Sequence, residues 1–205
     1  MSRASREVIL GAVSAAQPES LPLPDLAALG LGVGERPSVA AAVAILDQIG
    51  ARVLRLRDLN QVRQWVMQAH VEGASVVSAV PGIEGSVRLG ELQSPRDLDG
   101  VELGVMRARF GVCENGALWL EESDLAFCRA LPVIVQRWVV LVGAQDWVAD
   151  MHEAYARIGQ WHSGFGLFLA GPSKTADIEQ CLVIGAHGVV EATVLIVDEG
   201  LEPLA

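Results

Sequence analysis

The sequence is short of cysteines and of the clustered cations that bind nucleic acids. Its 205 residues include only three cysteines, whose wide spacing leaves no C-x-x-C pair. This arrangement argues against a zinc or iron–sulfur site on the chain and is typical of reduced thiols in a cytoplasmic protein. The formal net charge is −10. Because binding to nucleic-acid phosphates needs clustered lysine and arginine, no nucleic-acid partner is expected.

Long apolar runs and several well-known motifs are also missing. The most apolar stretch, residues 131–143, is interrupted by Gln136 and Arg137, so it does not predict a membrane span. The run at 8–16 resembles a signal peptide only weakly, because it is short and follows Glu7. We therefore expect a cytoplasmic protein with no membrane partner. The G-x-G-x-x-G, Walker A, G-x-S-x-G and H-E-x-x-H motifs are absent, which removes support for the chemistries that they carry.

What the sequence does contain is an alternation of helix-like and strand-like segments. Helical spacing occurs at 39–49, 59–72 and 147–158, and strand-like runs occur at 52–56, 75–80, 101–106, 133–142 and 193–197. This alternation predicts an α/β fold with a Rossmann-like, mostly parallel sheet and helices on both faces. Asp146 is expected to cap the helix at 147–158. Residues 1–36 are expected to form a helix and an extended arm that could support a homo-oligomer, and residues 37–205 a single domain.

A turn-like stretch with the sequence GPSKTADIE follows the apolar run at 165–170. The run predicts a buried strand, and the apolar spacing at Ile178, Cys181, Leu182 and Gly185 predicts a helix after the turn. The free N–H groups of a helix start attract anions, and Lys174 adds a positive charge beside them. Such a turn lies at the carboxyl edge of a parallel sheet, where ligands bind. A capped helix without a ligand gives the same pattern, so both interpretations stay open.

Four other groups of residues are candidates for a site. Glu114-Asn115-Gly116 predicts a tight hairpin turn, but its carboxylate and amide could also serve catalysis. Arg129 could clamp an anion or form a surface ion pair. The remaining candidates have structural alternatives as helix-surface and helix-end residues; they are His152, Tyr155, His187 and Gly188.

These residues resemble the LUD-domain family of the lactate-utilisation protein C type. The GPSKTADIE stretch with His187-Gly188 is similar to the signature of that family, and Glu114-Asn115-Gly116-Ala117 and residues 151–155 resemble a stand-alone branch. The resemblance covers residues 98–197. It implies a NagB/RpiA/CoA-transferase-like fold and a role in oxidising L-lactate to pyruvate. It also implies that iron–sulfur clusters are carried by partner proteins, with no cofactor on this chain.

Two alternatives to the lactate role remain open at this stage. The chain could be a self-contained enzyme for a small anionic substrate, such as a phosphosugar, a CoA thioester or a folate, or it could be a non-catalytic ligand-binding regulator. The candidate catalytic residues are Glu114, Asn115 and Lys174. The candidate substrate-binding residues are Gly116, Arg129, Gly171, Pro172, Ser173, Thr175, Asp177, Glu179, His187 and Gly188, with His152 and Tyr155 as further candidates.

Overall fold

The computed structural model describes residues 3–22, 24–25, 36–159, 164–177, 180–202 and 204. The chain divides into two units, Met1–Arg36 and Pro37–Ala205. The first unit contains helix α1 (Arg3–Ala15), where the sequence predicted a helix. Part of the expected arm, residue 23 and residues 26–35, lies outside the described residues. Within the described ranges, no helix has the length and apolar character needed to cross a membrane.

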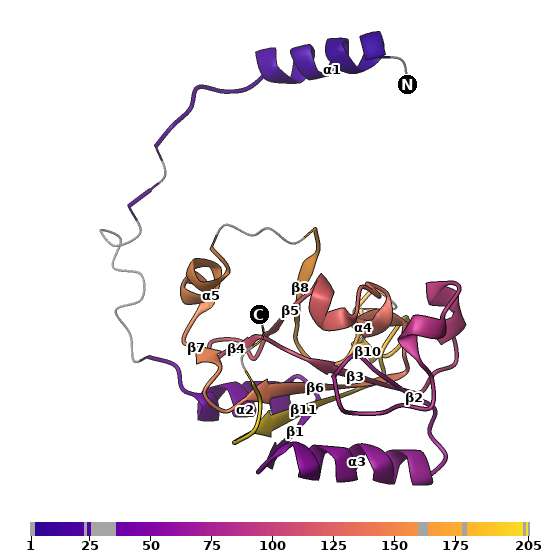
Figure 1. Cartoon of the computed structure of the whole chain (residues 1–205). Coiled ribbons are helices and arrows are strands. Elements are labelled where there is room, and N and C mark those ends of the chain that lie inside the picture. Colours follow the sequence, from indigo (N-terminus) through magenta and orange to yellow (C-terminus); the bar gives the residue numbers. More distant parts are fainter. Residues whose placement is uncertain are drawn as a thin grey trace. The chain divides into compact units, whose positions relative to one another are not determined.

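A five-stranded parallel sheet forms the centre of the second unit (Figure 1). Its strand order is β1-β11-β6-β3-β2, and each neighbouring pair is parallel. The predicted parallel α/β sheet is therefore confirmed. Both faces of the sheet are covered, which explains why its strands read as continuous apolar runs. The strands are β1 (Ala51–Leu56), β2 (Val76–Ser78), β3 (Leu103–Arg107), β6 (Arg137–Gly143) and β11 (Glu191–Val197).

Helix α3 (Leu59–Val71) covers one face of this sheet (Figure 1). The Asp58 carboxylate caps its first turn by accepting hydrogen bonds from the N–H groups of Asn60 and Gln61. Val62 and Val66 are buried against the sheet in one apolar cluster with Leu141 and Leu195. The opposite face packs against α2 (Val39–Gln48) and the short α4 (Leu131–Ile134), so helices lie on both faces as predicted.

A second, four-stranded sheet also covers that opposite face, and the sequence did not predict it. Its strand order is β7-β4-β5-β8, with β5 antiparallel to both β4 and β8. Helix α5 (Met151–Ile158) packs on its outer side through Ala154. The strands are β4 (Phe110–Val112), β5 (Leu118–Glu121), β7 (Trp147–Val148) and β8 (Gly166–Leu169). The apolar run before the GPSKTADIE stretch therefore belongs to this sheet and not to the parallel one.

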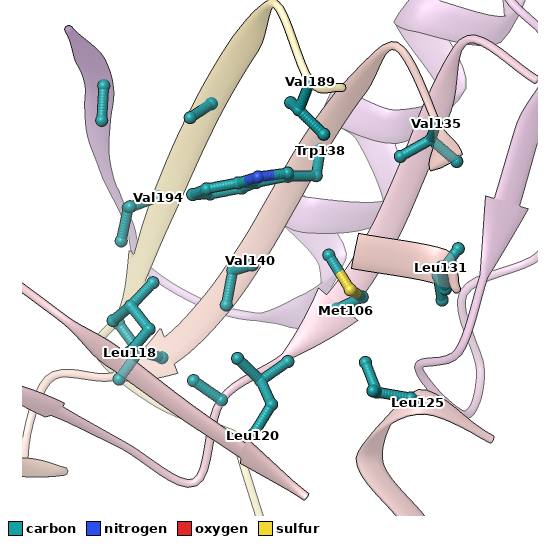
Figure 2. Packing of buried hydrophobic residues seen from close by; sticks show 14 of the residues in the cluster. Met106, Leu118, Leu120, Leu125, Leu131, Val135, Trp138, Val140, Val189 and Val194 are labelled. Atoms are coloured by element: carbon teal, nitrogen blue, oxygen red, sulfur yellow. The ribbon is translucent and has the colours of Figure 1, made fainter. Parts of the chain in front are cut away.

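The apolar cluster that joins the two sheets includes Trp138 of β6 (Figure 2). The indole lies among Val140, Val189 and Val194, and Leu118 of β5 approaches from the second sheet (Figure 2). All of these side chains are almost fully buried. This packing fixes the second sheet on the central one.

Several local predictions need correction. Asp150, and not Asp146, caps α5 by accepting a hydrogen bond of 2.8 Å from the N–H of Glu153. The strand expected from residue 133 begins at Arg137, because Pro132 lies in the first turn of α4. A 3₁₀ turn, η3 (Glu122–Leu125), follows β5. Two more 3₁₀ turns, η1 (Leu89–Glu91) and η2 (Pro95–Leu98), connect β2 to β3.

Candidate functional site

The GPSKTADIE stretch begins a short hairpin, and the helix predicted after it is absent from the described residues. Gly171 leaves β8 with φ +69°, and β9 (Lys174–Thr175) pairs antiparallel with β10 (Val183–Ile184). The predicted apolar stripe has no surface to pack on, since the Leu182 side chain is 66% exposed. Amphipathic helices depend on such packing. Ile178 and Glu179 lie outside the described residues.

The hairpin lies at the amino edge of the parallel sheet, and not at the carboxyl edge as expected. The Ser173 N–H donates to the carbonyl of Val189, just before β11, and its hydroxyl donates to the His187 carbonyl at 3.0 Å. Lys174, the single lysine of the chain, donates to the carbonyl of Ile49 at the end of α2. Its ammonium group thereby caps a helix C-terminus.

Glu114-Asn115-Gly116 forms the predicted tight turn between β4 and β5. Gly116 has φ +71°, and the Asn115 side-chain oxygen accepts a hydrogen bond of 2.9 Å from the N–H of Ala117. The exposed Glu114 carboxylate accepts a hydrogen bond of 2.9 Å from the N–H of Met151, the first residue of α5. Glu114 therefore caps the start of α5, as Lys174 caps the end of α2.

The structure brings these two predicted turns to the same end of the second sheet. Leu118 of β5 pairs with Leu169 of β8, so the chain segments just beyond them lie side by side. Both turns also pack against α2. A Cβ added to Gly116 would lie 2.8 Å from Leu46, and one added to Gly171 would lie 3.1 Å from Ile49.

The remaining predicted residues lie apart from that cluster or on the surface. Arg129 forms an ion pair of 2.7 Å with Glu122 and stacks over Phe165, at the opposite end of β5 and β8. The Arg129 hydrogen bond is the main cause that lowers the pKa of Glu122. Thr175 accepts a hydrogen bond from the N–H of Asp177 at 3.3 Å. Pro172 is buried, Gly188 has φ +123°, and the His152, Tyr155 and His187 side chains are exposed.

A different cavity lies at the carboxyl edge of the parallel sheet, where β3 leaves it to enter the second sheet. We name it the carboxyl-edge cavity; its volume is about 220 Å³. Arg107 ends β3, Asp146 follows β6, and Arg157 comes from α5. Open α/β sheets bind their ligands at this edge. The lining residues are Arg107, Arg109, Phe110, Trp119, Glu121, Asp146, Arg157, Ile158 and Leu204.

The arginines of this cavity differ in how tightly they are held. Arg109 is fixed by Asp124 at 2.8 Å, by Ser123 at 3.1 Å and by Glu121 at 3.5 Å. Arg157 lies 3.5 Å from Asp146, with its guanidinium 4.8 Å from the centre of the Phe110 ring.

Arg107 is the least satisfied of the three guanidinium groups. It donates to the carbonyl of Glu202, but its Nε is buried and has no hydrogen-bond partner within the described ranges. Burial lowers the pKa of Arg107, while Asp146 and Asp124 oppose that effect. A buried donor of this kind costs stability until a partner satisfies it.

The glycine that ends β6 helps to shape this cavity. A Cβ at Gly143 would lie 2.4 Å from the Asp146 carboxylate, so a larger residue would displace that carboxylate. Sequence reasoning missed the cavity because its lining residues are spread along the chain from Arg107 to Leu204. The available signal was Arg107 and Arg109, spaced by two at the carboxyl end of an apolar strand, because such side chains project to the same side.

A larger cavity of about 520 Å³ lies at the amino edge. Arg137 lines it with Glu191, and the two side chains are 3.9 Å apart. Ligands of open α/β sheets bind at the opposite edge, which favours the carboxyl-edge cavity. Within the described parts of the chain, no group of three or more His, Cys, Asp or Glu side chains is arranged to hold a metal ion.

Comparison with known proteins places these features in a family context. The pattern of the family described as the LUD domain matches residues 91–197. Lactate utilization protein C of Bacillus pumilus (strain SAFR-032) is 29% identical over 136 residues, which are 62% of this chain and 53% of that protein. Lactate utilization protein C of Shouchella clausii (strain KSM-K16) is 28% identical over 114 residues, 52% of this chain and 49% of that protein. The chain thus spans about half the length of these curated relatives.

A solved structure supports the fold. The crystal structure of a DUF162 family protein from Deinococcus radiodurans matches with a TM-score of 0.58 and 16% identity. The match covers 78% of this chain and 98% of that one. At this identity the likeness shows the α/β architecture. The matched residues include the Glu114-Asn115-Gly116 turn and the hairpin of β9 and β10. They also include every residue of the carboxyl-edge cavity except Leu204.

Proposed function

The chain belongs to the LUD-domain family, and we propose that it takes part in the oxidation of L-lactate to pyruvate. The observation that carries this proposal is its similarity to two relatives named lactate utilization protein C. The carboxyl-edge cavity lies almost wholly within the matched segment and supplies arginines suited to a small organic acid. The proposed role of this chain is to bind the anion.

The proposal assigns the electron carriers to partner proteins. Conversion of lactate to pyruvate releases two electrons and two protons, so an electron acceptor is required. Iron–sulfur clusters are usually held by four cysteine thiolates, whereas this chain has three cysteines. Cys113 is buried, Cys128 is half-buried and Cys181 is exposed. We therefore propose that iron–sulfur proteins accept the electrons beside this chain.

Gene deletion in the organism that encodes the chain tests this function. The deletion strain is expected to lose growth on L-lactate and keep growth on pyruvate, because only the oxidation step is removed. A plasmid copy of the gene should restore growth. Extracts of the deletion strain should also fail to form pyruvate from L-lactate. Undiminished pyruvate formation in those extracts would contradict the proposal.

A second candidate function is favoured by the two turns that meet at one end of the second sheet. Glu114 and Lys174 could serve a self-contained enzyme for a phosphosugar, a CoA thioester or a folate if they left their helix-end partners. Thermal shifts of the purified protein with these compounds test it. A ligand at about 100 times its dissociation constant should stabilise the fold by about 2.7 kcal/mol. A shift that persists in both Glu114→Gln and Lys174→Ala would exclude this enzyme.

A further inference from the structure

We propose that the carboxyl-edge cavity is a binding site for a small carboxylate monoanion and that Arg107 is its principal anchor. The inference names the anion site of the proposed function. It rests on that function only for the choice of lactate and pyruvate as ligands, because the arguments for the cavity come from its own residues.

Arg107 has a hydrogen-bond donor that is unsatisfied in the described part of the chain. Its Nε atom is buried without a hydrogen-bond partner, and its guanidinium forms no ion pair with a carboxylate among the described residues. Arg107 is half-buried, and the partial loss of water around a cation costs free energy. A carboxylate would satisfy both the charge and the unpaired N–H, since guanidinium and carboxylate groups form paired, parallel hydrogen bonds.

The three arginines of the cavity differ in how firmly their side chains are held. Arg109 is held by the buried Asp124 and by Ser123, so its position is fixed and its charge already has a partner. Arg157 is 43% exposed and only loosely paired with Asp146 at 3.5 Å, so it can turn toward a ligand. Arg107 therefore provides the half-buried anchor, and Arg157 provides a mobile second contact.

The charge and the size of the cavity limit the ligands that it can hold. Three arginines and two carboxylates line the cavity, and Asp124 pairs with Arg109 from outside the lining. This near balance of charge suits a monoanion better than a dianionic phosphate ester. Pockets for drug-sized molecules are about 300–1,000 Å³, so a volume of about 220 Å³ favours a smaller ligand.

The apolar part of the wall completes the match. Phe110, Trp119, Ile158 and Leu204 line the cavity beside the charged residues. They can accept the methyl group of a short organic acid while the arginines hold its carboxylate. A carboxylate at one end and a methyl group at the other are the features that lactate and pyruvate share.

Calorimetric titration of the full chain tests the inference. The probes are acetate, pyruvate, L-lactate and succinate, at constant ionic strength. At least one monoanion is expected to bind, and Arg107→Gln should weaken that binding by about ten-fold or more, because a charge-assisted contact is lost. Arg157→Gln should weaken it less. This second variant alters a partly exposed side chain, so it separates a binding effect from a folding failure.

Arg55→Gln is the matched control. Arg55 has the same kind of ion pair, at 2.7 Å to Asp198, but it lies outside the lining of the cavity. The affinity of this variant should stay within about two-fold of the wild type, as for a surface pair that contributes little.

The outcomes separate the cavity from the lactate role. Pyruvate binding that survives in Arg107→Gln and Arg157→Gln would overturn the cavity assignment and leave the lactate role standing. Binding of acetate alone, lost in Arg107→Gln, would support the cavity and count against lactate as its ligand. Absence of binding by all four probes would overturn the cavity assignment, while the gene deletion would still decide the lactate role.

Discussion

At the scale of single residues, polar groups in this protein are distinguished by whether their partners are already present. Glu114 and Lys174 looked like catalytic groups in the sequence, but each is bound to a helix end. Arg107 attracted no attention in the sequence, yet its buried Nε has no partner among the described residues. An unsatisfied buried donor is a better indication of a ligand site than residue type alone.

The ion pair between Glu122 and Arg129 gives a residue-scale prediction. The Arg129 hydrogen bond lowers the pKa of Glu122, so Arg129→Gln should raise that pKa toward its usual value. NMR titration of the Glu122 side-chain carboxyl carbon measures this change. Arg88→Gln is the matched control, since Arg88 pairs with Glu91 on another exposed segment and should leave the pKa of Glu122 unchanged.

The sign of the linked pH effect follows from the direction of that shift. A carboxylate with a lowered folded-state pKa stabilises the fold above its unfolded-state pKa and loses this contribution as pH falls through the folded-state value. As pH falls through the folded-state pKa of Glu122, the free energy of unfolding should therefore decrease more for the wild type than for Arg129→Gln. An unchanged pKa of Glu122 in Arg129→Gln would contradict the assigned cause.

At the scale of elements, the sequence predicted the features that local residue patterns determine. It missed the features that depend on pairing between strands far apart in the chain. The continuous apolar residues of β6 correctly indicated a doubly covered strand, and Asn115-Gly116 correctly indicated a turn. The second sheet was missed because β7 and β8 are short and half-buried, and their partners lie far away in the sequence. Apolar spacing after Lys174 resembled a helix, but spacing cannot show whether a surface exists to pack it on.

The turn between β4 and β5 gives an element-scale prediction. Gly116→Ala should destabilise the protein by about 2–4 kcal/mol, because Gly116 has a left-handed φ and an added Cβ would lie 2.8 Å from Leu46. Chemical denaturation measures the loss in the free energy of unfolding.

Two other glycines separate the causes in that experiment. Gly73 has a positive φ, but nothing lies near an added Cβ. Gly73→Ala should therefore lower the free energy of unfolding by about 1 kcal/mol through the backbone alone. Gly90→Ala has neither feature and should lie within about 0.5 kcal/mol of the wild type. Equal losses for Gly116→Ala and Gly73→Ala would show that contact with α2 does not matter.

At the scale of the whole α/β unit, the packing of two sheets creates the carboxyl-edge cavity. The backbone N–H of Ala108 donates to the Leu141 carbonyl of the central sheet, and the backbone N–H of Arg109 donates to the Trp119 carbonyl of the second sheet. The chain thus crosses from one sheet to the other within two residues, and Arg107 and Arg109 lie at that crossing. The sequence could predict the parallel sheet, but the cavity depends on how the second sheet is placed over it.

Trp138 gives the prediction at this scale. Its indole is 2% exposed and belongs to the apolar cluster that joins the two sheets (Figure 2). Trp138→Ala should lower the free energy of unfolding by about 3–5 kcal/mol, because of lost burial and the void left behind. Trp138→Phe should cost less, since the ring fills more of that space. A loss below about 1 kcal/mol for Trp138→Ala would mean that the sheets do not depend on this packing.

The most direct test of the account is a crystal structure of the protein with pyruvate. We predict electron density for the ligand in the carboxyl-edge cavity, with its carboxylate hydrogen-bonded to Arg107 and with Arg157 turned toward it. Density against Glu114 and Lys174, or in the amino-edge cavity, would contradict this account, as would an empty carboxyl-edge cavity at a pyruvate concentration that saturates binding in solution.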